Sequence, residues 1–150
     1  MGDDTAHPPR RRVLVPVDGS ANSGRVIEHL IREHRDGTPA ELVLLNVQMP
    51  LDSGHARMFV SPEAIQAWHR EQREKALQSA RTRLDAAGIP YAWHVTVGRI
   101  AETIVRFAGE QGCDSIVMGT RGRGALTHLL LGSVASAVSR DARIPVTLIK

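Results

Sequence analysis

The chain has 150 residues, of which 42% are hydrophobic, 23% charged and only 3% aromatic, and its formal net charge is +3. This length and composition are those of one globular domain. The scarcity of aromatic residues argues against a platform for stacked single-stranded bases. The one dense basic run, Arg10 to Arg12, is too short for a nucleic-acid-binding patch, so we expect no nucleic acid partner.

The beginning of the chain shows no sign of targeting to a membrane. Residues 1–11 lack the apolar core of a signal peptide, and no apolar stretch approaches the roughly 18 residues of a membrane span. We therefore expect a cytoplasmic protein without a membrane partner, with a flexible N-terminal tail at 1–11 and one domain at 12–150. The single cysteine, Cys113, precedes an apolar run, which favours a small buried side chain over a reactive thiol.

The first apolar run, Arg12 to Asp18, lacks polar alternation. Such a run is typical of a strand that is covered on both faces. Pro16 cannot donate to a sheet ladder, so we expect it near the end of this strand. Residues 21–34 carry apolar side chains at helical spacing, and Ser20 or Asn22 is the candidate N-cap of that helix.

The rest of the chain continues the alternation of strands and helices. Further strands are predicted at 41–47, 91–97, 114–119 and 144–150, and further helices begin near Ser61, Ile100 and Ser133. This alternation predicts an α/β fold, a single Rossmann-like doubly wound sheet of five parallel strands with helices on both faces. The strand order 3-2-1-4-5 is favoured, although the pattern alone leaves the flavodoxin-like order 2-1-3-4-5 open.

Two unusual segments follow the first and fourth strands, Asp18 to Ser20 and Gly119 to Gly122. In the order 3-2-1-4-5 these strand ends meet at the switch point, where such folds bind ligands. A carboxylate there can accept hydrogen bonds from ribose hydroxyls, and glycines let backbone N–H groups approach a polyanion. Residues 132–133 stand at the start of a helix, where free N–H groups favour phosphate. The backbone at 46–47 is placed to read the edge of a base.

Competing nucleotide and metal motifs do not fit the chain. Leu131 occupies the position where a Walker A loop needs lysine, and no G-x-G-x-x-G follows the first strand. The seven histidines are scattered, without the spacing of metal ligands.

The segment GTRGRGALTHLLLGS, Gly119 to Ser133, reads G-2x-G-9x-G-S. This pattern resembles the signature of the ATP-binding branch of the universal stress protein family. The resemblance extends to VLVPVDGS, LVLLNV, GCDSIVMGTRGRGAL and IPVTLIK, and so covers about residues 12–150. Asn46 departs from it, because histidine is frequent at that position in the family.

The resemblance implies that the chain binds ATP or a related adenine nucleotide with a divalent ion, Mg or Mn. Asp18 and Gly119 would hold the ribose, and the Val47 backbone would meet adenine. The phosphates would contact Gly122, Gly132, Ser133 and Val134. The full set expected to bind the nucleotide is Pro16, Val17, Asp18, Gly19, Ser20, Val47, Met118, Gly119, Arg121, Gly122, Gly132, Ser133 and Val134.

The resemblance also implies a homodimer that pairs through the last strand, Val146 to Ile149. A terminal apolar strand at a sheet edge is otherwise an exposed pairing template. A proline at Thr147 is therefore predicted to dissociate the dimer. We interpret Trp68 and Trp93 as packing residues on a helix and a strand, with a subunit contact as the alternative for Trp93.

Three classes of function fit these observations. The first is an ATP-binding regulatory protein of the stress response with slow or no ATP hydrolysis. The second is a weak ATPase or adenylyl-transfer enzyme, which ranks lower because phosphoryl transfer needs a placed base or arginine that the sequence does not reveal. The third is a dimeric protein-interaction module without nucleotide, a branch of the family that typically loses the glycine signature.

Overall fold

The computed structural model describes residues 10–50, 61–122 and 131–150. Within these ranges the elements are β1 (Arg12–Pro16), α1 (Ala21–Arg35), β2 (Glu41–Gln48), α3 (Pro62–Ala86), β3 (Tyr91–Val97), α4 (Ile100–Glu110), β4 (Ser115–Gly119), α5 (Ser133–Asp141) and β5 (Val146–Ile149). The strands form one parallel sheet in the order β3-β2-β1-β4-β5. The predicted α/β fold and strand order 3-2-1-4-5 are confirmed, and the flavodoxin-like order is excluded. Most of the predicted tail, residues 1–9, lies outside the described residues.

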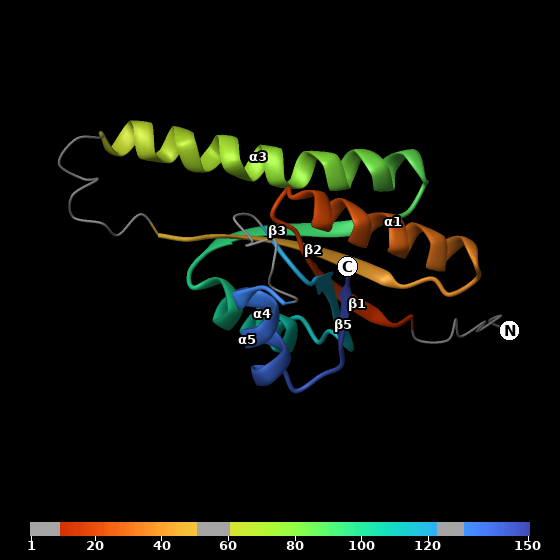
Figure 1. Cartoon of the computed structure of the whole chain (residues 1–150). Coiled ribbons are helices and arrows are strands. Elements are labelled where there is room, and N and C mark those ends of the chain that lie inside the picture. Colours follow the sequence, from red (N-terminus) through yellow and green to blue (C-terminus); the bar gives the residue numbers. More distant parts are fainter. Residues whose placement is uncertain (1–9, 51–60, 123–130) are drawn as a thin grey trace, which may run out of the picture.

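Helices cover both faces of the sheet, with α1 and α3 on one face and α4 and α5 on the other (Figure 1). This arrangement explains why the inner strands are apolar at successive positions. Val13 and Val15 belong to the cluster under α1 and α3, whereas Leu14 between them belongs to the cluster under α4 and α5. All three are fully buried, and burial of each such side chain stabilises the fold by about 1.5–3 kcal/mol.

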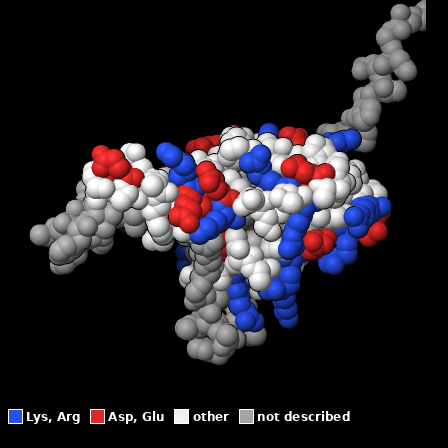
Figure 2. Space-filling view, turned by 90° about the horizontal axis from the view of Figure 1, so that it is seen from above, with Lys and Arg blue, Asp and Glu red and all other residues white. Residues whose placement is uncertain are grey.

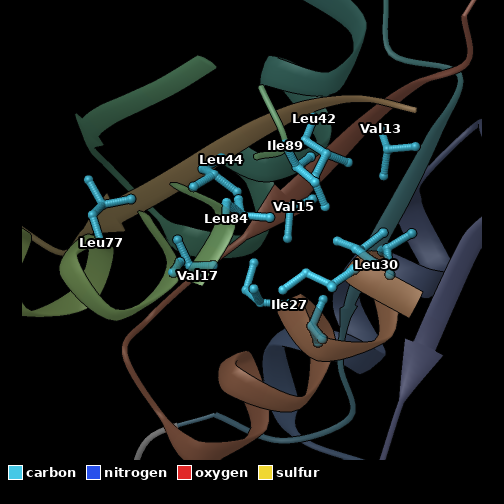
Figure 3. Packing of buried hydrophobic residues seen from close by; sticks show 14 residues of the cluster. Val13, Val15, Val17, Ile27, Leu30, Leu42, Leu44, Leu77, Leu84 and Ile89 are labelled. Carbon is cyan, nitrogen blue, oxygen red and sulfur yellow. The ribbon is translucent and has the colours of Figure 1, made fainter. Parts of the chain in front are cut away.

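Figure 3 shows the first of these clusters from close by. Ile27 and Leu30 of α1 and Leu84 of α3 gather over Val15 and Leu44 of the two central strands. The apolar spacing that predicted the first helix therefore reflects a stripe that faces this cluster. Ser20, one of the two candidate caps, is the N-cap of α1.

Pro16 marks the point where β1 and β4 separate. The β1–β4 pairing covers only Val13↔Ser115 and Leu14↔Ile116, whereas the β1–β2 pairing continues to Pro16. The backbone N–H of Val17 donates to Leu45 O at 2.9 Å, so Val17 faces β2 and the preceding residue, Pro16, faces β4. Because proline has no N–H, it cannot supply the next bond of the β1–β4 ladder. The crevice at the switch point opens at this residue.

Cys113 lies between α4 and β4 as a member of the second apolar cluster. It is buried, and burial raises the pKa of its thiol. A thiol held in the protonated form is a poor nucleophile, in agreement with its interpretation as a small packing residue.

The surface over α1 and α3 carries both signs of charge. Figure 2 shows Lys and Arg interspersed with Asp and Glu on this face. Ion pairs contribute to the mixing, such as Lys75–Glu71 at 2.7 Å and Arg83–Glu28 at 3.1 Å. Among residues 10–50, 61–122 and 131–150, no helix combines the length and the apolar character that crossing a bilayer requires.

Candidate functional site

A cleft lies at the carboxyl edge of the sheet, where β1, β2 and β4 end, and its cavity has a volume of about 550 Å³. The predicted site residues that line it are Pro16, Val17, Asp18, Val47, Met118, Gly119, Arg121, Gly122, Gly132, Ser133 and Val134. Gly19 and Ser20 are not among the lining residues. The structure thus gathers predicted residues from β1, β2, β4, α5 and their connections into one cleft, at the place that the strand order indicates.

Gly19 and Ser20 shape the turn between β1 and α1. Gly19 has a φ of +80°, a conformation that favours glycine. The Ser20 hydroxyl accepts a hydrogen bond from the backbone N–H of Ser23 at 3.2 Å and so caps α1. The two residues contribute to the site by fixing the course of the chain around Asp18.

Asp18 has a defined carboxylate position at the end of β1. Its Oδ1 atom accepts hydrogen bonds from the Ser20 backbone N–H at 2.9 Å and from the Ser23 hydroxyl at 2.7 Å. The Ser23 hydroxyl oxygen also accepts a bond from the Asp18 backbone N–H at 3.2 Å. The carboxylate is therefore held in place before any ligand arrives.

Gly122 lies opposite Asp18 across the cleft. A Cβ atom added to Gly122 would stand 2.5 Å from Asp18 Oδ2, closer than real Cβ contacts occur. Gly132 is confined in a similar way, because a Cβ there would lie 3.2 Å from the Thr120 carbonyl oxygen. Gly132 also donates its N–H to that oxygen at 2.6 Å. At these two glycines the backbone therefore borders the cleft without a side chain. Residues 123–130 of the glycine-rich segment lie outside the described residues.

Asn22 supports the site from behind its lining, a role that the sequence interpretation missed. Its side chain is buried, its Oδ1 atom accepts from the Arg121 backbone N–H at 2.8 Å, and its Nδ2 donates to Ile149 O at 3.0 Å. A Cβ at Gly119 would overlap this amide. Asn22 therefore ties α1 both to the start of the glycine-rich segment and to the end of β5.

The Asn46 side chain links the ends of β2 and β1. Its Nδ2 donates to the Val17 carbonyl at 2.8 Å, and its Oδ1 accepts from Gln48 Nε2. Asn46 is buried and lines the cleft next to Val47. Asn46 thus has a structural role within this chain.

Part of the cleft lining is apolar. Apolar side chains of β2, α4 and β4 contribute to it, namely Leu45, Val47, Ile100, Ile104 and Met118. Trp68, Gln72 and Ala76 of α3 add to this lining. The interpretation of Trp68 as a packing residue is wrong, because its side chain is 46% exposed. The spacing of four residues between Trp68, Gln72 and Ala76 is the sequence signal that could have placed them on one wall.

Trp93 lies away from this cleft on the edge strand β3. It is 46% exposed, and the Arg81 guanidinium lies 4.8 Å from the centre of its ring. This is the distance of a cation–π contact. Trp93 is therefore a surface residue in contact with Arg81 of α3, and its interpretation as a packing residue is wrong as well.

A second cavity, of about 750 Å³, lies between α3 and β3. Its lining contains Arg70, Arg73 and Arg81 together with Glu74 and Asp85. No glycine contributes to this lining, and the cavity follows the side of the sheet instead of crossing the strand ends. Its opposite charges and its position make it a weaker candidate for binding a polyanion.

The described part of the cleft holds one acidic and one basic lining residue, Asp18 and Arg121. Among the described residues, no group of three or more His, Cys, Asp or Glu is placed to hold a metal ion. Asp18 alone could approach a cation here. A divalent ion would therefore need most of its oxygen ligands from a bound ligand or water.

The fold and the cleft together define a doubly wound α/β domain with a ligand cleft at its switch point. The model of the Universal stress protein family matches residues 9–150. The chain therefore belongs to the universal stress protein family, as its resemblance in sequence indicated.

Individual relatives cover nearly the same span. Universal stress protein MJ0531 of Methanocaldococcus jannaschii is 30% identical over 146 residues, which is 93% of this chain and 82% of that protein. The solved structure of MJ0577, from the same organism, is 25% identical with a TM-score of 0.77, and the match covers 93% of this chain and 95% of that one. The universal stress protein from Archaeoglobus fulgidus, solved in complex with dAMP, is 26% identical with a TM-score of 0.62 over 93% of this chain and 98% of that one.

Proposed function

We propose that this chain binds ATP or a related adenine nucleotide in the cleft, with Mg or Mn, and acts as a regulatory protein of the stress response. The observation that carries the proposal is the polarity of the cleft. Part of the lining consists of apolar side chains, and another part of Asp18, Gly122, Gly132 and the start of α5 at Ser133. A nucleotide has the same division between an apolar base and an anionic phosphate chain. The complex of the Archaeoglobus relative with dAMP supports the same class of ligand.

Each part of the nucleotide has candidate partners in this arrangement. The Asp18 carboxylate, held by Ser20 and Ser23, would accept hydrogen bonds from ribose hydroxyls, with Gly119 beside it. The Val47 backbone would meet the edge of adenine. The phosphates would lie at Gly122, Gly132 and the N-terminus of α5, where Ser133 and Val134 offer backbone N–H groups and Ser133 a hydroxyl. The bound Mg or Mn would supply positive charge to the phosphates.

The same residues favour binding over rapid turnover. Efficient phosphoryl transfer requires a residue that positions the nucleophile and cations that neutralise the developing charge. Asp18 is the acidic residue among the described lining residues, and its Oδ1 atom already accepts two hydrogen bonds. We therefore propose slow or no hydrolysis, with a weak ATPase as the alternative.

Nucleotide content tests the proposal directly. Protein purified without added nucleotide is denatured, and the supernatant is separated by anion exchange against adenine nucleotide standards. We expect ATP at close to one molecule per chain, or saturable ATP binding with Mg in calorimetry if the purified protein is empty. An empty supernatant together with no titratable binding of ATP, ADP or AMP would reject the proposal and favour a dimeric interaction module.

We also propose a homodimer that forms through the outer edge of β5, and the hydrogen bonds of β5 show where to test it. Pro145 O and Ile149 O both accept bonds from β4 or the residue after it, from Ile116 N–H and Thr120 N–H at 2.9 Å each. Alternate residues of a strand point the same way, so Thr147 also faces β4. A proline at Thr147 would thus break the internal ladder, and the site first predicted for the test is wrong.

Leu148 presents its backbone N–H to the outer edge instead. Leu148→Pro is expected to dissociate the dimer, since it removes an edge donor, while Leu148→Ala removes the same side-chain packing but keeps the N–H. Sedimentation velocity should give a monomer for the proline variant and a dimer for the alanine variant. A dimer of unchanged affinity in Leu148→Pro would show that β5 is not the pairing edge.

A further inference from the structure

The C-terminal part of α3 packs on the sheet, whereas its N-terminal part extends past the sheet. Leu77, Ala80 and Leu84, in its C-terminal part, are buried and pack in the cluster on the sheet. The N-terminal part, drawn in yellow in Figure 1, continues beyond the carboxyl end of β2. This overhanging part has no sheet beneath it.

The overhanging part forms a wall of the cleft. Trp68, Gln72 and Ala76 are spaced by four residues, so they lie on one helical face, and all three line the cavity. Met49, directly after β2, lines it as well. Trp68 and Met49 are large apolar side chains that are 46% and 61% exposed. Two large, exposed apolar side chains therefore border the same cleft.

The position of this apolar wall selects the part of a ligand that it can meet. It lines the same cavity as the apolar side chains of Val47, Ile104 and Met118. A phosphate against these side chains would lose hydration without gaining N–H donors. A flat heteroaromatic ring would gain contact with the indole of Trp68 and with the apolar side chains around it.

We propose that Trp68 is the residue against which the base of the bound nucleotide stacks, and that it gives the cleft a preference for purines. The inference rests on the proposed nucleotide function and adds the wall that reads the base. A purine presents a larger ring system to an indole than a pyrimidine does, so stacking favours ATP over CTP. Stacking on one aromatic side chain corresponds to about a tenfold to hundredfold difference in affinity.

The composition of the chain makes the test specific. Trp68 and Trp93 are the two tryptophans, and Trp93 lies on β3 under Arg81, outside the cleft. In the Trp93→Phe variant, ATP should change the fluorescence of Trp68 saturably, with the same midpoint as in calorimetry. In the Trp68→Phe variant, the remaining Trp93 emission should not respond to ATP.

Affinity measurements complete the test. Trp68→Ala should weaken ATP binding about tenfold to a hundredfold and reduce the preference for ATP over CTP, whereas Trp68→Phe should weaken it less. The affinity for inorganic triphosphate, which has no base, should be the same in Trp68→Ala and the unchanged protein. This probe separates a lost stacking wall from a damaged cleft, and unfolding curves confirm that the half-exposed position tolerates alanine.

Two results would overturn the proposal, and they are distinguishable. If the unchanged protein binds ATP but Trp68→Ala binds it equally well and the Trp68 emission in Trp93→Phe stays constant, Trp68 does not stack on the base and only this inference fails. If the unchanged protein binds no adenine nucleotide at all, the proposed function fails and the stacking role fails with it.

Discussion

Replacing Gly122 by valine is expected to weaken ATP binding by roughly a hundredfold or more, equivalent to about 3 kcal/mol, while the fold remains intact. The reason is steric. The first carbon atom of the new side chain would stand 2.5 Å from Asp18 Oδ2, and its two methyl groups would extend into the space that the proposal gives to phosphate. Because Gly122 is exposed and lies between elements, the thermal midpoint should change by no more than about 3 °C. Calorimetry with ATP and Mg, together with a thermal unfolding curve, measures both quantities.

The chain offers a matched control for this substitution. Gly109 is an exposed residue of α4, and a Cβ there would meet nothing within 4 Å. Gly109→Val therefore introduces the same side chain into open space and should leave ATP binding unchanged. Equal ATP affinity in Gly122→Val and Gly109→Val would mean that the glycine-rich segment does not border the phosphates.

Asp18→Ala separates two ways in which valine at Gly122 could act. If the effect arises because valine displaces the carboxylate, removing the carboxylate should weaken binding nearly as much, and the double variant should add little. If valine occupies the phosphate position itself, Asp18→Ala should cost only the ribose contact, and the two losses should add. Calorimetric titration of the single and double variants gives this coupling.

The strands were predictable from sequence because the pattern of apolar residues in a strand reflects which of its faces are buried. The unbroken apolar run of β1 reflects burial under helices on both faces, and the alternating β3 is found at the edge of the sheet. The strand order was less accessible, since both doubly wound orders share the same alternation of strands and helices. Pro16 is the residue at which the crevice opens. The sequence alone does not show this, because it does not reveal which neighbouring strand the missing N–H of Pro16 would face.

The glycines led to the cleft, whereas the supporting residue Asn22 and the lining residue Trp68 were missed for identifiable reasons. Asn22 stands in the first turn of α1, where an asparagine reads as a helix cap, yet Ser20 is the cap. The partners of the Asn22 amide are instead 99 and 127 residues away in the chain. Trp68 was missed because its exposure depends on how far α3 continues past the sheet. Apolar spacing along a helix does not reveal that length.

Asn22→Asp is expected to destabilise the fold by about 3 kcal/mol at pH 7. The substitution keeps the size of the side chain and the oxygen that accepts from Arg121 N–H at 2.8 Å. It replaces the Nδ2 donor, which lies 3.0 Å from Ile149 O, by a second oxygen that carries negative charge. A buried carboxylate would then face the carbonyl oxygen of Ile149, to which the Thr120 N–H still donates.

The sign of the pH dependence follows from this geometry and distinguishes it from a general loss of packing. The folded chain disfavours the charged form of the new carboxyl group, so its pKa in the folded state would lie above the unfolded value of about 3.9. The loss in free energy of unfolding is complete above the pKa that the new carboxyl group has in the folded state. It shrinks as the pH falls toward 4, where the protonated group can again donate to Ile149 O. Urea unfolding at pH 7 and pH 4, each relative to the unchanged protein, measures this loss.

Gln78→Glu makes the same chemical change on the exposed surface of α3. Its free energy of unfolding should stay within about 0.5 kcal/mol of the unchanged protein at both pH values. A deficit in Asn22→Asp that is absent at pH 7, or equal at both pH values, would mean that the Asn22 amide does not hold β5 to α1.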